Sequence, residues 1–334
     1  MKNPIFHFPP LGEFKFVENL LKNGVPLEEC PPANRNWLSA GDDAAIFDGW
    51  LATKDLSVEG VHFRLDWSSP EQAVEKHIVS NVSDICSMGG EPRLALFGIC
   101  VGKNWSEETK KRIVSAVSKG FASRGIAVIG GDTVGGCVGM FSTTLLGVQR
   151  GEKPLLRSGA VPGDKVYVSG SLGKSAAGLY VLENHPEDVP RFSDLVEYHL
   201  CPKIDENMGK KLVDWGVTGG CIDISDGLSS ELNHLALSSG VQIEIDENLL
   251  PVDAKVQEMA DYYGISALNL AMNGGEEYQL LFSSSCLDSI FQDEDSRPSG
   301  VYPIGVVKQG SSVWMNIMDG SRKMVNAQAW SHLC

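Results

Sequence analysis

Aspartates at the ends of apolar, strand-like segments are the residues of this sequence most suited to chemistry. Each lies beside a glycine or a small polar residue, in the five segments Gly41–Asp43, Thr53–Asp55, Ser83–Asp84, Gly130–Thr133 and Asp223–Gly227. Carboxylates that cluster without matching cations repel one another and raise each other's pKa, unless a metal ion lies among them. Mg²⁺ prefers carboxylate oxygens, waters and substrate phosphates as its ligands. The pattern therefore favours several metal ions held between strands of one sheet.

A single aspartate of this kind has a simpler interpretation as a helix cap or turn residue. Asp226, which precedes Gly227 and a predicted helix, is a candidate N-cap. Five such segments in one chain make a purely structural interpretation weaker.

Charge and length narrow the class of protein that carries these aspartates. The chain has 334 residues, with 28 Lys+Arg against 43 Asp+Glu and a formal net charge of −15. This length predicts about two domains. The acidic balance, without a basic patch, argues against nucleic acid as a partner. Small anionic substrates would also be repelled unless divalent cations invert the local charge.

Neither a membrane span nor a disulfide framework is indicated. No segment approaches the ~20 apolar residues that a spanning helix needs, and the first residues lack the apolar core of a signal peptide. No two of the eight cysteines are three positions apart, so a zinc-ribbon or thioredoxin-type pair is not expected. These features predict a reduced, cytoplasmic chain with no membrane partner.

Apolar runs with strand character alternate with amphipathic helical runs along the chain. Strands are expected at Ala44–Phe47, Trp50–Thr53, Leu94–Val101, Ile126–Ile129, Met140–Val148, Val166–Ser169 and Cys221–Ile224. Helices are expected from Ser69-Pro70 to Gly89, over Trp105–Ala122, from about Ser175, and from Leu228 to Gly240. The segment Gly151–Pro154 resembles a joint, which predicts one domain over residues 1–150 and another over 151–334.

Common nucleotide and hydrolase motifs are absent. Gly170–Ser175 resembles a phosphate-binding loop, but two residues instead of four separate its glycines. It is interpreted as a strand-to-helix turn whose helix N-terminus can face an anion. No two glycines are separated by a single residue, which excludes the dinucleotide fingerprint. The serine-hydrolase elbow and the zinc-protease motif are also missing.

Seven short motifs together resemble the thiamine-monophosphate kinase family, part of the superfamily that includes aminoimidazole ribonucleotide synthetase. They are Gly41–Ala45, Val58–Phe63, Asn81–Gly90, Gly130–Thr133, Arg157–Asp164, Ile222–Leu228 and Gly274–Tyr278. The resemblance extends from about Gly12 to Trp330. It implies a two-domain synthetase-like α/β and α+β fold. An N-terminal mixed sheet with flanking helices would pair across a homodimer, and a C-terminal α+β domain would complete the nucleotide and substrate site.

The resemblance also implies ATP-dependent, Mg²⁺-dependent phosphorylation of thiamine monophosphate to the diphosphate. The magnesium ligands carried over by position are Asp43, Thr53, Asp55, Asp84, Asp132, Asp223 and Asp226. The implied nucleotide contacts are Gly131, Arg157 and Ser225, and the implied thiamine contacts are His62, Glu276 and Trp330. No side-chain nucleophile is expected, because the attacking oxygen belongs to the substrate phosphate and transfer needs positioning and charge neutralisation.

Simpler alternatives exist for several of these residues. His62 would be a packed histidine, Glu276 a solvated charge, and Arg157 a surface ion-pair partner; Trp330 would cover apolar surface. The chain also departs from the family at two positions: Lys54 stands where a second hydroxyl is usual, and Glu277 stands in place of an aspartate.

Two other functions compete with the kinase. One is another ATP-using synthetase of the superfamily, of the hydrogenase-maturation or selenophosphate type. The terminal Cys334 is a reminder of this alternative, although the tail motif of the hydrogenase-maturation relative is otherwise missing. The other is a non-catalytic acidic metal-binding protein, which would bind cations without turning over ATP.

Overall fold

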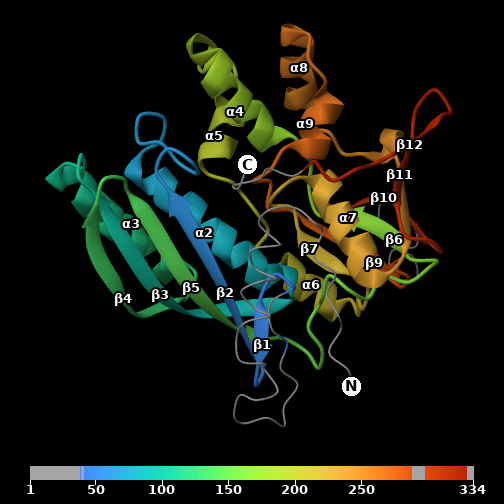
Figure 1. The fold of residues 1–334 in the computed structure, drawn as a ribbon, viewed down its shortest axis with the longest axis horizontal. Helices are drawn as coiled ribbons and strands as arrows, with labels where there is room; N and C mark the ends of the chain where they lie inside the picture. Colours follow the sequence, from blue (N-terminus) through green and yellow to red (C-terminus); the bar gives the residue numbers. More distant parts are fainter. Residues whose placement is uncertain (1–37, 39–40, 288–297, 329–334) are drawn as a thin grey trace.

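The computed structural model describes residue 38 and residues 41–287 and 298–328 of the chain. These residues form two mixed sheets, one in each half of the chain, with helices packed against them (Figure 1). The expected combination of α/β and α+β structure is confirmed. Pairing of the first sheet across a dimer stays a prediction, as does the domain boundary at residue 150.

The first sheet has five strands in the order β1-β2-β5-β3-β4, of which only the β3–β4 pair is parallel. The strands are β1 Ala45–Phe47, β2 Trp50–Val58, β3 Gly90–Gly102, β4 Ala127–Gly136 and β5 Met140–Gln149. All five were expected, but β2, β3 and β4 are longer than predicted. The apolar run of β2 ends at Thr53, whereas its pairing with β5 continues through Lys54 and Asp55.

Helix α2 (Pro70–Ser87) covers one face of this sheet. Its start is fixed by a capping box, in which the Ser69 hydroxyl accepts from Gln72 N and the Gln72 side chain accepts from Ser69 N. The left-handed Gly89, with φ 70°, follows its end. Four fully buried residues form its apolar stripe: Val74, Ile78, Val82 and Ile85. The expected helix is therefore confirmed at both ends.

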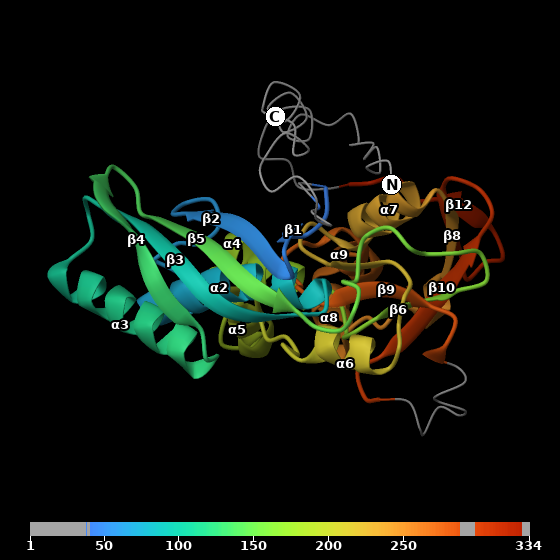
Figure 2. The same ribbon diagram turned by 90° about the horizontal axis from the view of Figure 1, so that it is seen from below.

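Helix α3 (Glu107–Ser123) packs beside α2, so that both helices lie on the same side of the sheet (Figure 2). We call the opposite side the open face, because no described element covers it. Thr53 of β2 contacts α2, so alternate residues such as Leu56 point to the open face. The exposed apolar residues there are Leu56, Leu96, Val134 and Val148. Strand β4 is exposed along nearly all of its length.

The second sheet has seven strands in the order β12-β11-β8-β10-β6-β9-β7, and only β8 and β11 run parallel. They are β6 Lys165–Val168, β7 Cys221–Asp223, β8 Gln242–Asp246, β9 Leu280–Ser284, β10 Tyr302–Lys308, β11 Val313–Asn316 and β12 Arg322–Met324. The two strands expected in this half, β6 and β7, are confirmed.

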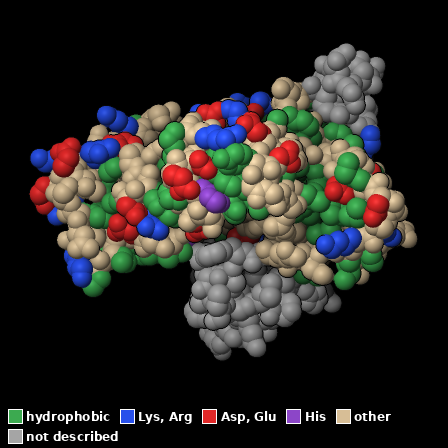
Figure 3. Space-filling view, turned by 90° about the horizontal axis from the view of Figure 1, so that it is seen from above, with side chains coloured by type: hydrophobic (Ala, Val, Ile, Leu, Met, Phe, Trp, Pro, Cys, Tyr) green, Lys and Arg blue, Asp and Glu red, His purple; other side chains and the backbone are tan. Residues whose placement is uncertain are grey.

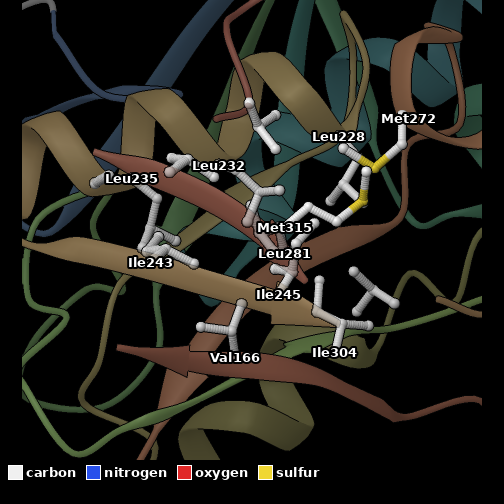
Figure 4. Packing of buried hydrophobic residues seen from close by; sticks show 14 of the residues in the cluster. Val166, Leu228, Leu232, Leu235, Ile243, Ile245, Met272, Leu281, Ile304 and Met315 are labelled. Carbon is white, nitrogen blue, oxygen red and sulfur yellow. The ribbon is translucent and has the colours of Figure 1, made fainter. Parts of the chain in front are cut away.

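The helices of the second half are α4 Lys174–Asn184, α5 Ser193–Leu200, α6 Met208–Asp214, α7 Leu228–Ser239, α8 Ala254–Tyr263 and α9 Ala267–Asn273. Two single-turn 3₁₀ helices, η2 Pro186–Asp188 and η3 Glu247–Leu249, connect them. The predicted leucine face of α7 packs on the sheet, where Leu228, Leu232 and Leu235 join Ile243 and Leu281 in one buried cluster (Figure 4). Helices α4, α5 and α8 share a second cluster.

Helix α2 lies between the two halves of the chain. It packs on the first sheet and also contacts β7, α5 and α6. Among the described residues, no helix combines the length and apolar character that crossing a bilayer requires. The position of α2 matters most for function, because its second face meets the ends of strands from both halves.

Candidate active site

A polar stripe runs along the face of α2 that meets the second half. It consists of Lys76, Ser80, Ser83 and Ser87, spaced four, three and four residues apart, so all four project from one side of the helix. Lys76, Ser83 and Ser87 are buried. Each of the four contacts a different carboxylate, and these carboxylates come from four separate segments.

Two of these carboxylates come from different halves of the chain and are both hydrogen-bonded to α2. Asp43, which precedes β1, accepts a hydrogen bond from the Ser87 hydroxyl. Asp223, at the end of β7, accepts one from Ser83 Oγ at 2.6 Å. Both aspartates are buried. The strand-end position noted in the sequence therefore places them side by side along α2.

Two further aspartates complete this group on the side of the first sheet. Asp55 of β2 is hydrogen-bonded to Ser80. Asp84, which belongs to α2 itself, accepts a hydrogen bond from the Thr53 hydroxyl of β2. Thr53 and Asp55 are alternate residues of one strand, so both side chains face the helix. We call Asp43, Asp55, Asp84 and Asp223 the acidic cluster.

The members of the acidic cluster influence one another electrostatically. Burial raises the pKa of Asp84 well above its ordinary value, and its neighbours Asp55, Asp223 and Asp43 raise it further. The pKa of Asp223 is raised to about 8, first by burial and then by the charge of Asp43. Buried carboxylates that repel one another in this way are suited to a cation. Their hard oxygen donors fit Mg²⁺.

Arg157 lies against one end of the acidic cluster. Its Nε and Nη2 donate to Asp43 Oδ1 at 2.9 and 2.6 Å, and its backbone N–H donates to the Asp42 carboxylate. Burial, and then the charge of Asp43, raise the pKa of Asp42 to about 7. The Asp43 side chain is 0% exposed. The alternative of a surface ion pair is therefore wrong.

The loop after β7 holds Ser225 and Asp226 beside the acidic cluster. Their backbone N–H groups donate to Glu231 Oε1 at 3.1 and 2.8 Å. Glu231 is buried, and its raised pKa arises from burial first and then from the charge of Asp226. The N-cap of α7 is Gly227, with φ 124° and no side-chain cap. The capping interpretation of Asp226 is therefore wrong.

Gly131 and Asp132 are the predicted residues that the structure leaves apart from the acidic cluster. Both lie in β4 and are exposed. Strand pairing places Asp132 in one row with Leu56, on the open face and not on the face toward α2. Strands β5 and β3 separate β4 from β2, which is about 14 Å at the usual strand spacing. Within one chain, Asp132 therefore does not join the other carboxylates.

His62 and Glu276 lie near the other end of the polar stripe. Glu276 Oε2 is 2.7 Å from Lys76 Nζ and 3.7 Å from His199 Nδ1. Burial raises the pKa of Glu276, but the charges of Lys76 and His199 outweigh this effect, and His62 adds to them, so the pKa falls below its ordinary value. Glu276 is thus a paired carboxylate and not a solvated charge. His62 Nδ1 accepts from Val58 N at 3.1 Å.

Several residues of this site were missed in the sequence. Lys76 and the three serines of α2 repeat with helical spacing opposite the apolar stripe, and that repeat was the available signal. His199 carries no such signal, because its partners Ser175 and Glu276 are distant in the sequence. Glu231 lies five and six residues from its partners, but they bind it through backbone N–H groups, which leave no mark in the sequence. Trp330, the third expected thiamine contact, lies outside the described residues.

The two departures from the family pattern have different surroundings. Lys54 is exposed and its ammonium group donates to Ser142 Oγ, on the sheet face opposite α2. Glu277 is fully buried at the N-terminus of α4, where its Oε1 accepts from Ser175 N at 3.0 Å. Burial raises the pKa of Glu277 to about 8. Gly170–Ser175 is indeed a strand-to-helix turn, and the group facing the N-terminus of its helix is the buried carboxyl group of Glu277.

Comparison with known protein families shows which class of domain the first part of the chain resembles. The family model for the N-terminal domain of AIR synthase related proteins matches residues 41–149, which include the first sheet, α2 and three members of the acidic cluster. The first sheet and α2 are therefore similar to the N-terminal domain of AIR synthase related proteins, and this is the class of domain that the match defines.

Relatives that match most of the chain identify the family to which it belongs. Thiamine-monophosphate kinase of Pyrococcus horikoshii is 34% identical over 88% of this chain and 90% of its own length. The enzyme of Corynebacterium glutamicum is 34% identical over 80% of both chains. A solved structure described as AaThiL complexed with AMPPCP and TMP superimposes with a TM-score of 0.79, at 30% identity and 96% coverage of both chains. The chain belongs to the thiamine-monophosphate kinase family and is a kinase. The synthetase and non-catalytic alternatives are not favoured.

Proposed function

We propose that this enzyme transfers the γ-phosphoryl group of ATP to thiamine monophosphate, giving thiamine diphosphate and ADP. The observation that carries this proposal is the convergence of four carboxylates from both halves along one face of α2. A kinase for two anionic substrates needs such a cation-binding centre, since the chain itself has a net charge of −15. The relative described with AMPPCP and TMP supports the same pair of ligands.

Asp43, Asp55, Asp84 and Asp223 would hold Mg²⁺, with Thr53 and Asp226 at the edge of the cluster. Bound Mg²⁺ would neutralise phosphate oxygens and orient the two substrates. The raised pKa values of Asp84 and Asp223 support this fit, because a cation removes the repulsion that causes part of the rise. The serines of α2 and the Thr53 hydroxyl orient the carboxylates.

Transfer is proposed to be direct and in line. A phosphate oxygen of thiamine monophosphate forms a bond to the γ-phosphorus while the bond from that phosphorus to the β–γ bridging oxygen breaks, and ADP leaves with the electron pair. The attacking oxygen is already anionic at neutral pH, so no side chain has to act as a base or nucleophile. Arg157 and Ser225 would bind the nucleotide at one end, and His62 and Glu276 the thiamine rings at the other.

A homodimer formed through the first half of the chain is part of this proposal. The open face of the sheet carries the exposed residues Leu56, Leu96 and Val134, and apolar sheet surface of this kind favours a partner. Gly131 and Asp132 are exposed on β4 and lie away from the acidic cluster of their own chain. We assign them to the site of the partner subunit. Five of the described cysteines, Cys86, Cys100, Cys137, Cys201 and Cys221, form no disulfide, which supports a cytoplasmic location.

A coupled assay for ADP release tests the function. The expected result is ADP release that requires both Mg²⁺ and thiamine monophosphate, with thiamine diphosphate as the product found by chromatography. Release of ADP and phosphate without thiamine monophosphate, or transfer to a different acceptor only, would contradict the proposal.

A further inference from the structure

Lys76 is a buried cation that no part of the phosphoryl transfer described above uses. It is the first residue of the polar stripe of α2, and its side chain is only 8% exposed. Its Nζ is 2.7 Å from Glu276 Oε2, a residue 200 positions away in the chain. The pair therefore joins the first half of the molecule to the loop that carries Glu276.

The backbone of the loop that carries Glu276 has hydrogen bonds of its own, in addition to the contacts of the Glu276 side chain. Glu276 N donates to Ser225 O at 2.7 Å, and Tyr278 N donates to Ile224 O at 2.8 Å. Glu276 and Tyr278 both have positive φ, of 60° and 53°, which is costly for residues other than glycine. A strained backbone that is fixed to the loop after β7 presents the Glu276 side chain in one direction, toward α2.

Two groups from different helices then determine where the carboxylate lies. Lys76 of α2 and His199 of α5 both approach Oε2, at 2.7 and 3.7 Å. His199 is itself held by Ser175 Oγ, 3.1 Å from its Nδ1. The Glu276 side chain remains 26% exposed. Among the described residues, both contacts fall on Oε2, and a ligand would therefore be met by Oε1.

The length of α2 sets the separation between this carboxylate and the acidic cluster. Lys76 and Asp84 are eight residues apart on one helix, which corresponds to about 12 Å along its axis. A substrate with a cationic ring system at one end and a phosphate at the other fits between two such anchors. Free phosphate or a compact phosphate ester would reach only one of them.

We propose that Lys76 is a positioning residue that fixes Glu276 at a set distance from the acidic cluster and thereby selects phosphates carrying an extended cationic ring system. This inference rests on the proposed function, and in particular on the contact of Glu276 with the thiamine end of the substrate. Lys76 touches neither the reacting atoms nor the nucleotide. Its effect is exerted on substrate affinity through Glu276.

The test compares Lys76→Met, Lys76→Arg, Glu276→Gln and the double variant Lys76→Met/Glu276→Gln. Lys76→Met is expected to raise the KM for thiamine monophosphate about tenfold, because a charged hydrogen bond is lost. The kcat and the KM for ATP should change by less than about twofold, since neither depends on this anchor. Lys76→Arg should recover most of the affinity. Lys110→Met, which removes a surface lysine also 2.7 Å from its partner, is the matched control.

Removal of one member of a buried pair lowers stability, so the double variant is essential. Because it removes both charges, it is expected to fold and to show the same KM as Glu276→Gln alone, which is the signature of coupled residues. If Glu276→Gln raises the KM but Lys76→Met does not, the inference on Lys76 is wrong while the proposed function stands. If the double variant shows the full sum of the two single effects, Lys76 acts independently of Glu276 and the inference is also wrong. If Glu276→Gln leaves the KM unchanged, both the inference and the thiamine contact are wrong.

Discussion

At the scale of single residues, substitution of Asp84 or Asp223 distinguishes a role in metal binding from a role in folding. Asp84→Asn and Asp223→Asn should each abolish phosphoryl transfer, because in each variant a proposed anionic Mg²⁺ ligand is replaced by a neutral amide. Each substitution also relieves repulsion within the acidic cluster, so the Mg²⁺-free protein should unfold at the same or a higher temperature. Activity and thermal unfolding are measured on one preparation, with Asp261→Asn on the surface of α8 as control. Near-normal turnover at low Mg²⁺ would contradict the assignment.

The sequence predicted the carboxylates of the site, but it did not predict the serines that position them. Asp43 and Asp223 stand next to strand ends beside small residues, and that local pattern alone predicted them as metal ligands. Asp55 was predicted in the same way from the apolar run that ends at Thr53, although the structure places it inside β2. The serines of α2 escaped notice because serine is common and its partners lie far away in sequence. Asp226 was ambiguous, since the sequence of an N-cap and that of a metal-binding turn are alike. The structure places the N-cap at Gly227, with no side-chain cap, and this rules out the capping role for Asp226.

At the scale of elements, the N-terminus of α4 holds an unusual carboxyl group. Glu277 Oε1 accepts from Ser175 N, but its buried Oε2 has no hydrogen-bond partner among the residues that the structure describes. Its pKa is about 8 in the folded chain against an ordinary value of 4.5. The stabilising contribution of the protonated group is therefore complete below pH 4.5 and is lost as the pH rises through 8.

Glu277→Gln should remove this pH dependence, because the amide keeps an acceptor oxygen for Ser175 N and cannot ionise. The thermal midpoint of the variant relative to the parent chain is expected to increase steadily from pH 5 to pH 8.5. Thermal unfolding at several pH values measures this difference, and Glu108→Gln on the exposed face of α3 is the control. A difference that stays constant with pH would show that Glu277 does not titrate in this range.

Elements with strong local signals were predicted accurately, and those determined by neighbours were not. Helix α2 was located at both ends because Ser69, Pro70 and Gly89 specify a start and a stop. Strand β4 was expected to end at Ile129, yet it continues to Gly136 through glycines and Asp132. Its pairing with β3 holds that segment extended, and this long-range contact has no local signature.

At the scale of the whole molecule, the open face of the first sheet is the exposed apolar surface that the proposed dimer would bury. Leu56→Glu or Val134→Glu would place a charge in the proposed apolar interface and should convert the proposed dimer to a monomer with loss of activity. Sedimentation velocity and the ADP-release assay measure the two effects. Val114→Glu, an exposed apolar position on α3 that is 66% exposed, is the matched control and should change neither. A fully active monomer of the unaltered chain would contradict the dimer.

The position of Asp132 leads to a stricter test of the assembled molecule. Asp132 lies on the open face about three strands from Asp55, so in the proposed dimer it serves the partner's site. Asp132→Asn and Asp84→Asn should each be inactive alone. When subunits of the two variants are mixed and exchanged, half of the dimers are mixed dimers, each with one unaltered site, so about a quarter of the full activity should return. Activity that does not return, although exchange is confirmed by differently tagged subunits, would place Asp132 and Asp84 in the same site or remove Asp132 from the metal ligands.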